Sequence, residues 1–155
     1  MYSSATFTIS SDGDNITLTG STDINATGNN SANRLRGNSG ANTLSGGEGN
    51  DTLIGNAGDD ILDGGDNTDT AVFSDSDNQV DLRITVSQNT GDGNDTLTSI
   101  ENVNAGGGDD TVYGNSGANV LKGEGGADTL YGNEGNDILN GGLGDDILDG
   151  GDESD

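Results

Sequence analysis

The sequence predicts an all-β protein, a parallel β-solenoid in which two nine-residue units make one turn. Three observations predict this fold class. A nine-residue pattern recurs along most of the 155-residue chain, with glycines in the first half of each unit and a short aliphatic stretch in the second. Hydrophobic residues make up only 27% of the sequence, which is too little for a conventional two-layer core. Finally, the period is constant over many units, and a constant period is stronger evidence for a solenoid than any local secondary-structure propensity is against it.

The N-terminal residues 1–27 are expected to lead into the solenoid as short strands or a cap. The stretches TFTIS at 6–10 and NITLTG at 15–20 are rich in β-branched residues, which favour strands. The first ten residues lack the basic and apolar regions of a cleaved signal peptide. We therefore expect a cytosolic chain, a chain exported by another route, or a piece of something longer.

The first repeat block covers 28–72 in five units, and GGEGNDTLI at 46–54 is typical. Glycines at positions 1, 2 and 4 permit positive φ and close backbone approach, so positions 1–6 are expected to form a tight turn. Positions 7–9 are expected to form a short strand, in which position 8 faces inward. The predicted core series across all units is Leu35, Leu44, Leu53, Leu62, Ala71, Leu97, Val112, Leu121, Leu130, Leu139 and Leu148.

Residues 73–104 interrupt the period. Within them 79–87 alternates apolar and polar residues, which predicts a longer strand with Val80, Leu82, Ile84 and Val86 facing inward. An isolated copy, TGDGNDTLT, occupies 90–98, and LTSIENVN at 97–104 suggests further strands. The sequence leaves open whether this segment continues the coil or caps it.

The second repeat block covers 105–155. Residues 28–69 align with 114–155 at a shift of 86, and both copies end in similar motifs, GDDILDGGDNTD and GDDILDGGDESD. We therefore expect the chain to be an excerpt from a longer tandem protein.

The charge of the chain limits the classes of partner that it can bind. The formal net charge is −24, from 28 acidic residues against Arg34, Arg36, Arg83 and Lys122. Such a surface argues against nucleic acid or anionic lipid, because phosphate binding requires clustered cations. The chain has no cysteine and no histidine, so disulfides, the usual zinc sites and imidazole catalysis are not available. No stretch resembles a transmembrane helix, so membrane insertion is not expected.

The recurrent aspartate at position 6 raises an electrostatic problem. Stacked turns lie about 4.8 Å apart, which brings successive carboxylates into columns where like charges repel. A hard divalent cation removes that repulsion. Calcium takes six to eight oxygen ligands and accepts carboxylates together with backbone carbonyls, whereas magnesium prefers a smaller octahedral shell. We therefore expect several calcium ions, roughly six to eight, in the turns.

The units follow G-G-x-G-x-D-x-U-x, where U is a large aliphatic residue. This pattern resembles the repeats-in-toxin (RTX) nonapeptide, the haemolysin-type calcium-binding repeat, in eleven full copies that cover about 100 residues. The resemblance implies a right-handed parallel β-roll with Ca²⁺ in its turns. Members of that family are typically secreted by type I systems through an uncleaved C-terminal signal, and they fold outside the low-calcium cytosol.

The resemblance also implies the ligands, position by position. The side-chain ligands would be Asp51, Asp60, Asp69, Asp95, Asp110, Asp128, Asp137, Asp146 and Asp155. The glycines of the same turns would contribute through their backbone, at Gly46, Gly49, Gly55, Gly58, Gly64, Gly123, Gly126, Gly132, Gly135, Gly141 and Gly144. Asparagine replaces the carboxylate at Asn33, Asn42 and Asn119, where weak or unused sites are expected. Asn67 and Glu153 replace the position-4 glycine, which predicts irregular loops, and the position-5 acids Asp59, Asp109 and Asp145 should face solvent.

The leading functional hypothesis is a calcium-binding structural module of a secreted bacterial protein, which acts as a spacer or stabiliser and is not an enzyme. One alternative is a subunit of a calcium-dependent surface fibre, surface layer or adhesin, which associates end to end or with further tandem repeats of its parent chain. A weaker alternative is a polysaccharide-binding module attached to an enzyme, with Arg34 and Arg36 as its basic patch. An EF-hand at 75–80, a glycosidase carboxylate pair and an ice-binding threonine row all fit the sequence poorly.

Overall fold

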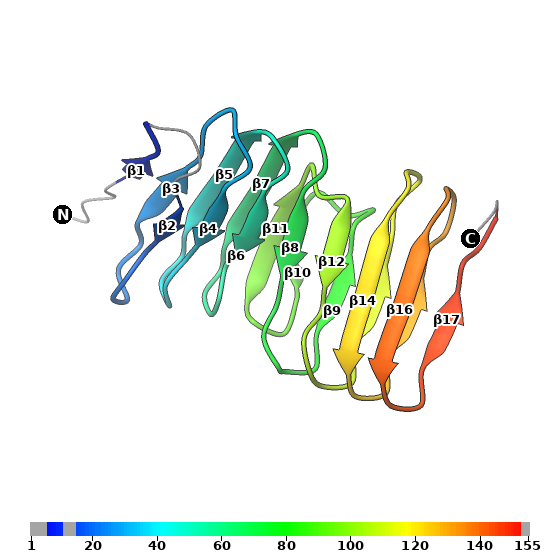
Figure 1. Ribbon diagram of the computed structural model, residues 1–155. Coiled ribbons are helices and arrows are strands. Elements are labelled where there is room, and N and C mark those ends of the chain that lie inside the picture. The colour runs from blue at the N-terminus through cyan, green and yellow to red at the C-terminus, as the bar shows by residue number, and fades with distance from the viewer. Residues whose placement is uncertain (1–5, 11–14, 153–155) are drawn as a thin grey trace.

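A computed structural model describes residues 6–10 and 15–152 of the chain (Figure 1). Within these ranges the protein is all-β, as predicted, and contains no helix that could span a membrane. The strands stack side by side along one axis, with β1 (Thr6–Thr8) at one end and β17 (Ile147–Asp149) at the other (Figure 1). The long axis of the molecule therefore follows the order of the repeats.

The remaining strands are short, as the pattern predicts. They are β2 (Ile16–Thr17), β3 (Asn25–Thr27), β4 (Arg34–Arg36), β5 (Thr43–Glu48), β6 (Thr52–Ile54), β7 (Ile61–Asp66), β8 (Thr70–Val72), β9 (Gln79–Asp81), β10 (Gln88–Asn89), β11 (Asn94–Thr98), β12 (Asn102–Asn104), β13 (Thr111–Tyr113), β14 (Val120–Gly125), β15 (Thr129–Tyr131) and β16 (Ile138–Leu143). The early strands β1 and β2 extend the coil, because β1 pairs with β3 and β2 pairs with β4.

Successive units alternate between two faces of the solenoid. One face is a seven-stranded sheet in the order β16-β14-β12-β8-β6-β4-β2, which runs along the whole stack. The other face is divided into a six-stranded sheet, β1-β3-β5-β7-β11-β10, and a four-stranded sheet, β17-β15-β13-β9. Every pairing between described strands is parallel except that of β10 with β11. This second face is divided at the place where the nine-residue repeat is interrupted.

The core is mainly a ladder of position-8 side chains between the two faces, and Phe73, Leu82 and Ile100 of the interrupting segment are buried with it. Leu35 pairs with Leu53, and Val112 with Leu130, so that like residues stack turn upon turn. Nine of the eleven predicted core residues are buried. Leu139 is only partly buried and Leu148 is 49% exposed, because they lie at the C-terminal end of the stack, where no further described turn covers them.

Four strands extend beyond their own repeat unit, which the sequence does not predict. β5, β7, β14 and β16 continue from the aliphatic positions into the glycines of the next unit. There Gly47 pairs with Gly65, and Glu124 pairs with Gly142. Backbone hydrogen bonding thus extends into what was expected to be turn, and part of each turn is held by the same ladder as the strands.

The predicted long strand over 79–87 is wrong beyond Asp81, although Leu82 is buried as predicted. β9 ends at Asp81, whose side chain accepts a hydrogen bond from the Arg83 N–H (2.9 Å), while the Ile84 N–H donates to the Asp81 carbonyl (3.2 Å). These two bonds turn the chain, so Ile84 and Val86 are exposed instead of buried. A local side-chain bond of this kind competes with strand pairing and overrides the alternating pattern.

Residues 73–104 nevertheless belong to the solenoid. β9 lies against β13, and the isolated copy at 90–98 supplies β11, which lies against β7 and places Leu97 beside Leu62. β12 then joins β8 to β14. In chain order, β9 therefore comes before β11, although β11 is the strand that pairs with β7. The stack is stepped at this point (Figure 1).

Candidate metal centre

The position-6 aspartates lie inside the turns. Of the predicted ligands, seven are at most 5% exposed, namely Asp51, Asp60, Asp69, Asp95, Asp110, Asp128 and Asp137. Asp146, in the last described repeat, is half-buried, and Asp155 lies outside the described residues. The three position-5 acids are exposed, as predicted. Because an ionised carboxylate is costly to bury without partners, the contacts of each oxygen decide what these residues do.

One oxygen of each buried carboxylate joins neighbouring turns. The Asp51 Oδ1 accepts a hydrogen bond from the Asn33 N–H at 2.7 Å, eighteen residues earlier. The same bond recurs along the stack, from Asn42 to Asp60, Asp51 to Asp69, Asp60 to Asp95, Asn78 to Asp110, Asp110 to Asp128, Asn119 to Asp137 and Asp128 to Asp146, at 2.7–3.0 Å. These bonds give the aspartates a structural role whether or not an ion is bound.

The second oxygen has no such bond. The Oδ2 atoms of Asp51, Asp60, Asp69, Asp110 and Asp128 are buried and have no hydrogen-bond partner among the described residues. Loss of hydration raises the pKa of Asp60 to about 7 and those of Asp69 and Asp110 to about 6. The same cause raises the pKa values of Asp51, Asp95 and Asp128. These carboxylates resist carrying a charge unless a positive charge lies beside them.

The unpartnered oxygens of Asp51, Asp69 and Asp128 each face a backbone carbonyl. A methyl group placed on Gly46 would overlap both the Asp51 Oδ2 and the carbonyl oxygen of Gly64 in the next turn. The same overlap, of a carboxylate with the following turn's carbonyl, occurs at Gly64 and Gly123. Two kinds of acceptor atom therefore converge on the space that the position-1 glycine leaves open. Oxygens of this kind are the ligands that calcium prefers.

The glycines at positions 2 and 4 have a different purpose from those at position 1. Gly47 and Gly49 have φ values of 111° and 109°, and Gly58, Gly126, Gly135 and Gly144 also have positive φ. The position-1 glycines have ordinary φ values and are needed for space alone. Asn67 replaces a position-4 glycine yet reaches a φ of 88°, which asparagine tolerates better than most residues. The irregular loop expected at Asn67 is therefore not observed, and Glu153 lies outside the described residues.

Side chains alone do not make a metal site in this protein. Within residues 6–10 and 15–152 no three acidic side chains gather closely enough to hold an ion. Any cation in these turns must take most of its ligands from backbone carbonyls, with one or two aspartate oxygens supplying the charge. Calcium accepts such a mixed shell, whereas the usual zinc sites are built from histidine and cysteine, which this sequence lacks.

The asparagine turns are closed by their own amides. In the turn at 37–42, the Asn42 Oδ1 accepts from the Asn38 N–H (2.8 Å) and its Nδ2 donates to the Ile24 carbonyl (2.7 Å). The Asn38 Oδ1 in turn accepts from the Gly40 N–H (2.8 Å). The turn at 114–119 repeats this set, and positions 2 and 4 of both turns lack positive φ. The amide nitrogen supplies the donor that an aspartate lacks, which supports the expectation that these sites are weak.

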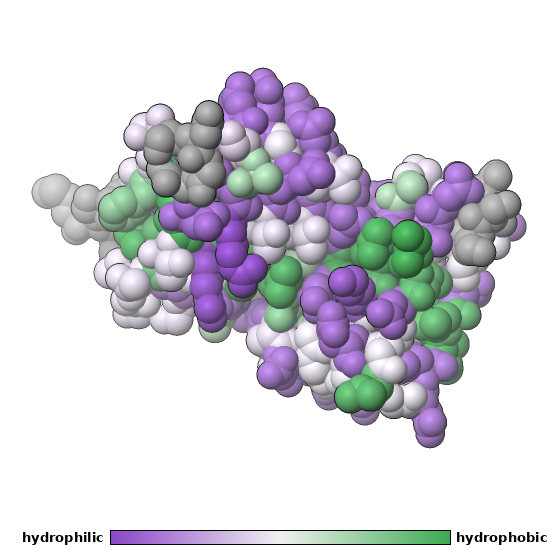
Figure 2. Space-filling model, in the orientation of Figure 1, coloured by the Kyte–Doolittle hydropathy of each residue, from purple (hydrophilic) through white to green (hydrophobic). Residues whose placement is uncertain are grey.

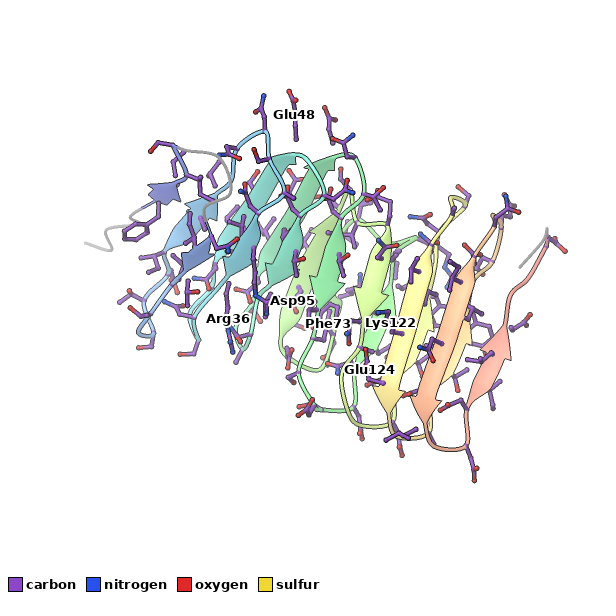
Figure 3. The ribbon with its side chains drawn as sticks, viewed as in Figure 1. Arg36, Glu48, Phe73, Asp95, Lys122 and Glu124 are labelled. Atoms are coloured by element: carbon purple, nitrogen blue, oxygen red, sulfur yellow. The ribbon has the colours of Figure 1, made fainter. Side chains whose placement is uncertain are left out.

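Asp95 differs from the other aspartates. Its unit begins with Thr90 instead of glycine, and the Thr90 hydroxyl donates to the Asp95 Oδ2 while the Asp60 N–H donates to Oδ1 at 2.8 Å. Both oxygens thus have donors, so this turn has less need of a cation than its neighbours. Figure 3 shows Asp95 in the middle of the stack, whereas Glu48, at position 3 of a regular turn, points away from it.

The sequence pattern did not identify two residues that occupy position 6 in the structure. Glu101 accepts from the Asp69 N–H at 2.8 Å and so replaces the aspartate in a shortened unit. Asn78 occupies position 6 of a glycine-free unit, 73–81, whose Val80 pairs with Val112. Neither unit carries the glycine signal. Reading Val80 and Val103 as position-8 residues is the only sequence feature that would have placed them in register.

Comparison with known proteins agrees with the geometry of these turns. A family model described as RTX calcium-binding nonapeptide repeat (4 copies) matches the chain at 27–62, 36–71, 100–130 and 122–155. These matches cover well over half of the chain and leave out 72–99, where the repeat is interrupted. No curated protein matches the chain.

Proposed function

The chain belongs to the RTX calcium-binding nonapeptide repeat family, and from this premise we propose that it is a calcium-responsive structural module of a secreted protein. Its turns bind Ca²⁺ through the position-6 aspartates and neighbouring carbonyls, and the chain folds when it meets extracellular calcium. Export through a type I system, a role as spacer or stabiliser and the absence of catalysis are parts of the same proposal.

The observation that carries this proposal is the row of buried, unpartnered Oδ2 atoms at Asp51, Asp60, Asp69, Asp110 and Asp128. An unpaired buried charge is among the most destabilising features that a folded protein can contain. Here the feature recurs along the stack, and at Asp51, Asp69 and Asp128 the unpartnered oxygen faces a carbonyl oxygen of the next turn. A divalent cation satisfies the carboxylate and the carbonyl together, so its binding favours the folded state.

The magnitudes support a folding switch. Extracellular calcium sites commonly bind with Kd values of about 10⁻⁴–10⁻³ M. At millimolar calcium each such site adds about 0.4–1.4 kcal/mol of stability. With roughly six to eight sites, the sum is about 2–11 kcal/mol, which is comparable to the whole net stability of an ordinary domain. Calcium concentration would thus decide whether the solenoid is folded.

Circular dichroism tests the proposal. The full chain should give a disordered spectrum in excess chelator and a β spectrum in millimolar Ca²⁺, with a cooperative transition between them. Millimolar Mg²⁺ should restore much less β signal, because its octahedral shell fits these carbonyl-rich turns poorly. The same β content in chelator as in calcium would refute the proposal.

The C-terminal end of the stack favours a second candidate, end-to-end assembly into a calcium-dependent fibre or layer. Ile138, Leu143, Ile147 and Leu148 are 49–80% exposed on the last described strands, and apolar surface gathers toward that end of the molecule (Figure 2). An uncovered apolar sheet edge invites a further strand. Light scattering should then rise on calcium addition and fall back in a Leu143→Ser variant, whereas a spacer that stays monomeric gives no rise.

A further inference from the structure

The glycine-free turn at 73–78 is in register with the calcium turns although its sequence, FSDSDN, shares none of their glycines. The Asn78 N–H donates to the Asp110 Oδ1 at 2.7 Å, the same bond that joins successive position-6 residues elsewhere. The strand that follows, β9, pairs with β13. This turn therefore lies directly beside the turn at 105–110, although the family matches leave it out.

The Asn78 amide lies among an excess of acceptor atoms. Its Nδ2 lies 3.0 Å from the Ser74 carbonyl oxygen, 2.5 Å from that of Ser76, 2.9 Å from that of Ala105 and 3.3 Å from the Asp110 Oδ1. An amide nitrogen carries only two hydrogens, so it cannot satisfy four acceptors at once. Three backbone carbonyls and a carboxylate thus converge on one point with too few donors.

The other half of the same amide has the opposite defect. Asn78 is only 2% exposed, and its Oδ1 has no hydrogen-bond partner among the described residues. The Asp110 Oδ2 is likewise buried and unpartnered. Asn119 provides the contrast within the chain, because its Oδ1 accepts from the Asn115 N–H and its Nδ2 donates to the Glu101 carbonyl. Asn78 therefore does not close its turn in the way that Asn119 does.

We propose that the space between the turns at 73–78 and 105–110 is a further site for a hard divalent cation, with calcium as the ion that fits it best. A half-turn about the Cβ–Cγ bond of Asn78 exchanges its nitrogen and oxygen, and Oδ1 then joins the carbonyl oxygens of Ser74, Ser76 and Ala105 and the Asp110 carboxylate. All five groups offer oxygen, which calcium prefers, and the cation supplies the positive charge that the acceptors lack.

The composition of the site sets its strength. Asn78 contributes a neutral oxygen where regular turns contribute a carboxylate, and calcium affinity falls as the number of charged ligands falls. The exposed acids Asp75 and Asp77 on the same turn raise the local concentration of cations without being ligands. The site is therefore weaker than the aspartate turns, and it holds β9 against β13 at the step in the stack.

Ion counting on the full chain tests the site. Native mass spectrometry in calcium gives the number of bound ions, and calorimetry gives their affinities. Asn78→Asp restores the charged ligand and should strengthen binding of one ion about tenfold without changing the number bound at saturation. Asn78→Leu removes the oxygen and should lower the number by one. Asn119→Asp is the comparison variant. It places a carboxylate in a turn that is closed by its own amide, so it should add one ion to the count instead of strengthening an existing site.

The Asn78 site rests on the proposed function only for the identity of the ion, and the possible results distinguish failure of the one from failure of the other. If the unmodified chain binds no calcium, the proposed function fails. If it binds calcium, but Asn78→Asp changes no affinity and Asn78→Leu changes no count, the regular sites stand and the Asn78 site is refuted. Should Asn78→Leu fail to give a β spectrum in calcium, Asn78→Asp alone decides the matter.

Discussion

At the scale of single residues, the side chain at position 6 determines the chemistry of each turn. Aspartate and asparagine have nearly the same shape, and both accept or make inter-turn bonds in this stack. They differ in the partners of their two terminal atoms. In Asn42 the nitrogen donates to the Ile24 carbonyl of the preceding turn, and Oδ1, which lies beside Gly37, accepts from the Asn38 N–H. In Asp51 the Oδ1 accepts from the preceding turn, and Oδ2, which lies beside Gly46, has no donor. A turn that closes by itself is therefore distinguished by a donor to the oxygen beside the position-1 glycine, and a turn without that donor is expected to need a cation.

Asp51→Asn should have opposite effects with and without calcium. In millimolar Ca²⁺ the variant should lose one ion and about 0.4–1.4 kcal/mol of unfolding free energy. In chelator it should be more stable than the unmodified chain, because the amide nitrogen can donate to the Gly64 carbonyl and no buried charge remains. Urea unfolding in both conditions measures the two effects.

Glu48→Gln is the matched control, since it removes one negative charge from an exposed residue of the same turn. It should change the unfolding free energy only slightly in either condition. Asp51→Asn would contradict the metal role of Asp51 if it were destabilising by the same amount with and without calcium.

Gly46→Ala should destabilise the calcium-bound fold by about 1–3 kcal/mol, because its methyl group overlaps the Asp51 carboxylate and the Gly64 carbonyl. Gly125→Ala is the matched control. Gly125 also lies in the stack, yet a methyl group there meets no atom within 4 Å and its φ is not positive. Thermal unfolding in calcium compares the two variants, and equal changes in Tm would contradict the role assigned to position 1.

At the scale of elements, the protein contains two kinds of turn on one strand pattern. Regular glycine–aspartate turns use positive φ at positions 2 and 4, and most of them bury a carboxylate oxygen without a donor. Where β5, β7, β14 and β16 precede such a turn, the sheet also continues into it. Asparagine turns use ordinary φ values and a network of side-chain amides. The first kind gains stability from a cation, and the second kind is complete without one.

Hydrogen exchange should distinguish the two kinds of turn. On calcium removal, amides in 46–72 should lose much more protection than amides in 28–45, where two asparagine turns lie next to each other. The reason is that Asp51 and Asp69 are neighbours in one column and repel each other when both are charged. Mass spectrometry of proteolytic peptides in calcium and in chelator measures the difference. Equal loss in both segments would show that the turn type does not matter.

At the scale of the whole molecule, stability and charge oppose each other. The core is narrow and consists mostly of aliphatic residues, with Phe73 also in it, and the chain carries a net charge of −24. Each repeat contacts only its neighbours, as in other solenoids, so local gains and losses add along the stack. Binding of divalent cations adds core-like stability and cancels charge in the same turns, which is why folding should depend so strongly on calcium.

The metal-free chain should also respond to pH. Asp60, Asp69 and Asp110 have folded pKa values of about 6–7 against an ordinary value of 3.8. Between these values the folded state binds more protons than the unfolded state, so the stability of the fold falls as pH rises. This contribution is complete below about pH 4 and is lost as pH rises through about 7.

Calcium-depleted protein should therefore gain β structure when the pH is lowered from 8 to 5, as followed by circular dichroism. In saturating calcium this gain should vanish, since protons then compete with the bound ions for the same carboxylates. A β signal in calcium-depleted protein that stayed flat or fell between pH 8 and pH 5 would contradict the raised pKa values.

The repeat by itself determined the all-β class, the parallel pairing, the position-8 core and the buried aspartate column. It could do so because regular neighbours are eighteen residues apart, and each unit specifies its own contacts with the next. The pattern also indicated the asparagine turns as exceptions, although the amide bonds that close them could not be read from it.

Only the tertiary structure decided what happens where the period breaks. There the inter-turn bond joins Asp60 to Asp95 across 35 residues and Asn78 to Asp110 across 32. Nothing in the sequence of 73–104 shows that β9 lies beside β13 or that β11 returns to β7. Local bonds at Asp81 also ended a strand that the alternation favoured. Contacts between distant segments and competing side-chain bonds leave no periodic trace, and the unsatisfied Asn78 amide becomes visible only once those segments are side by side.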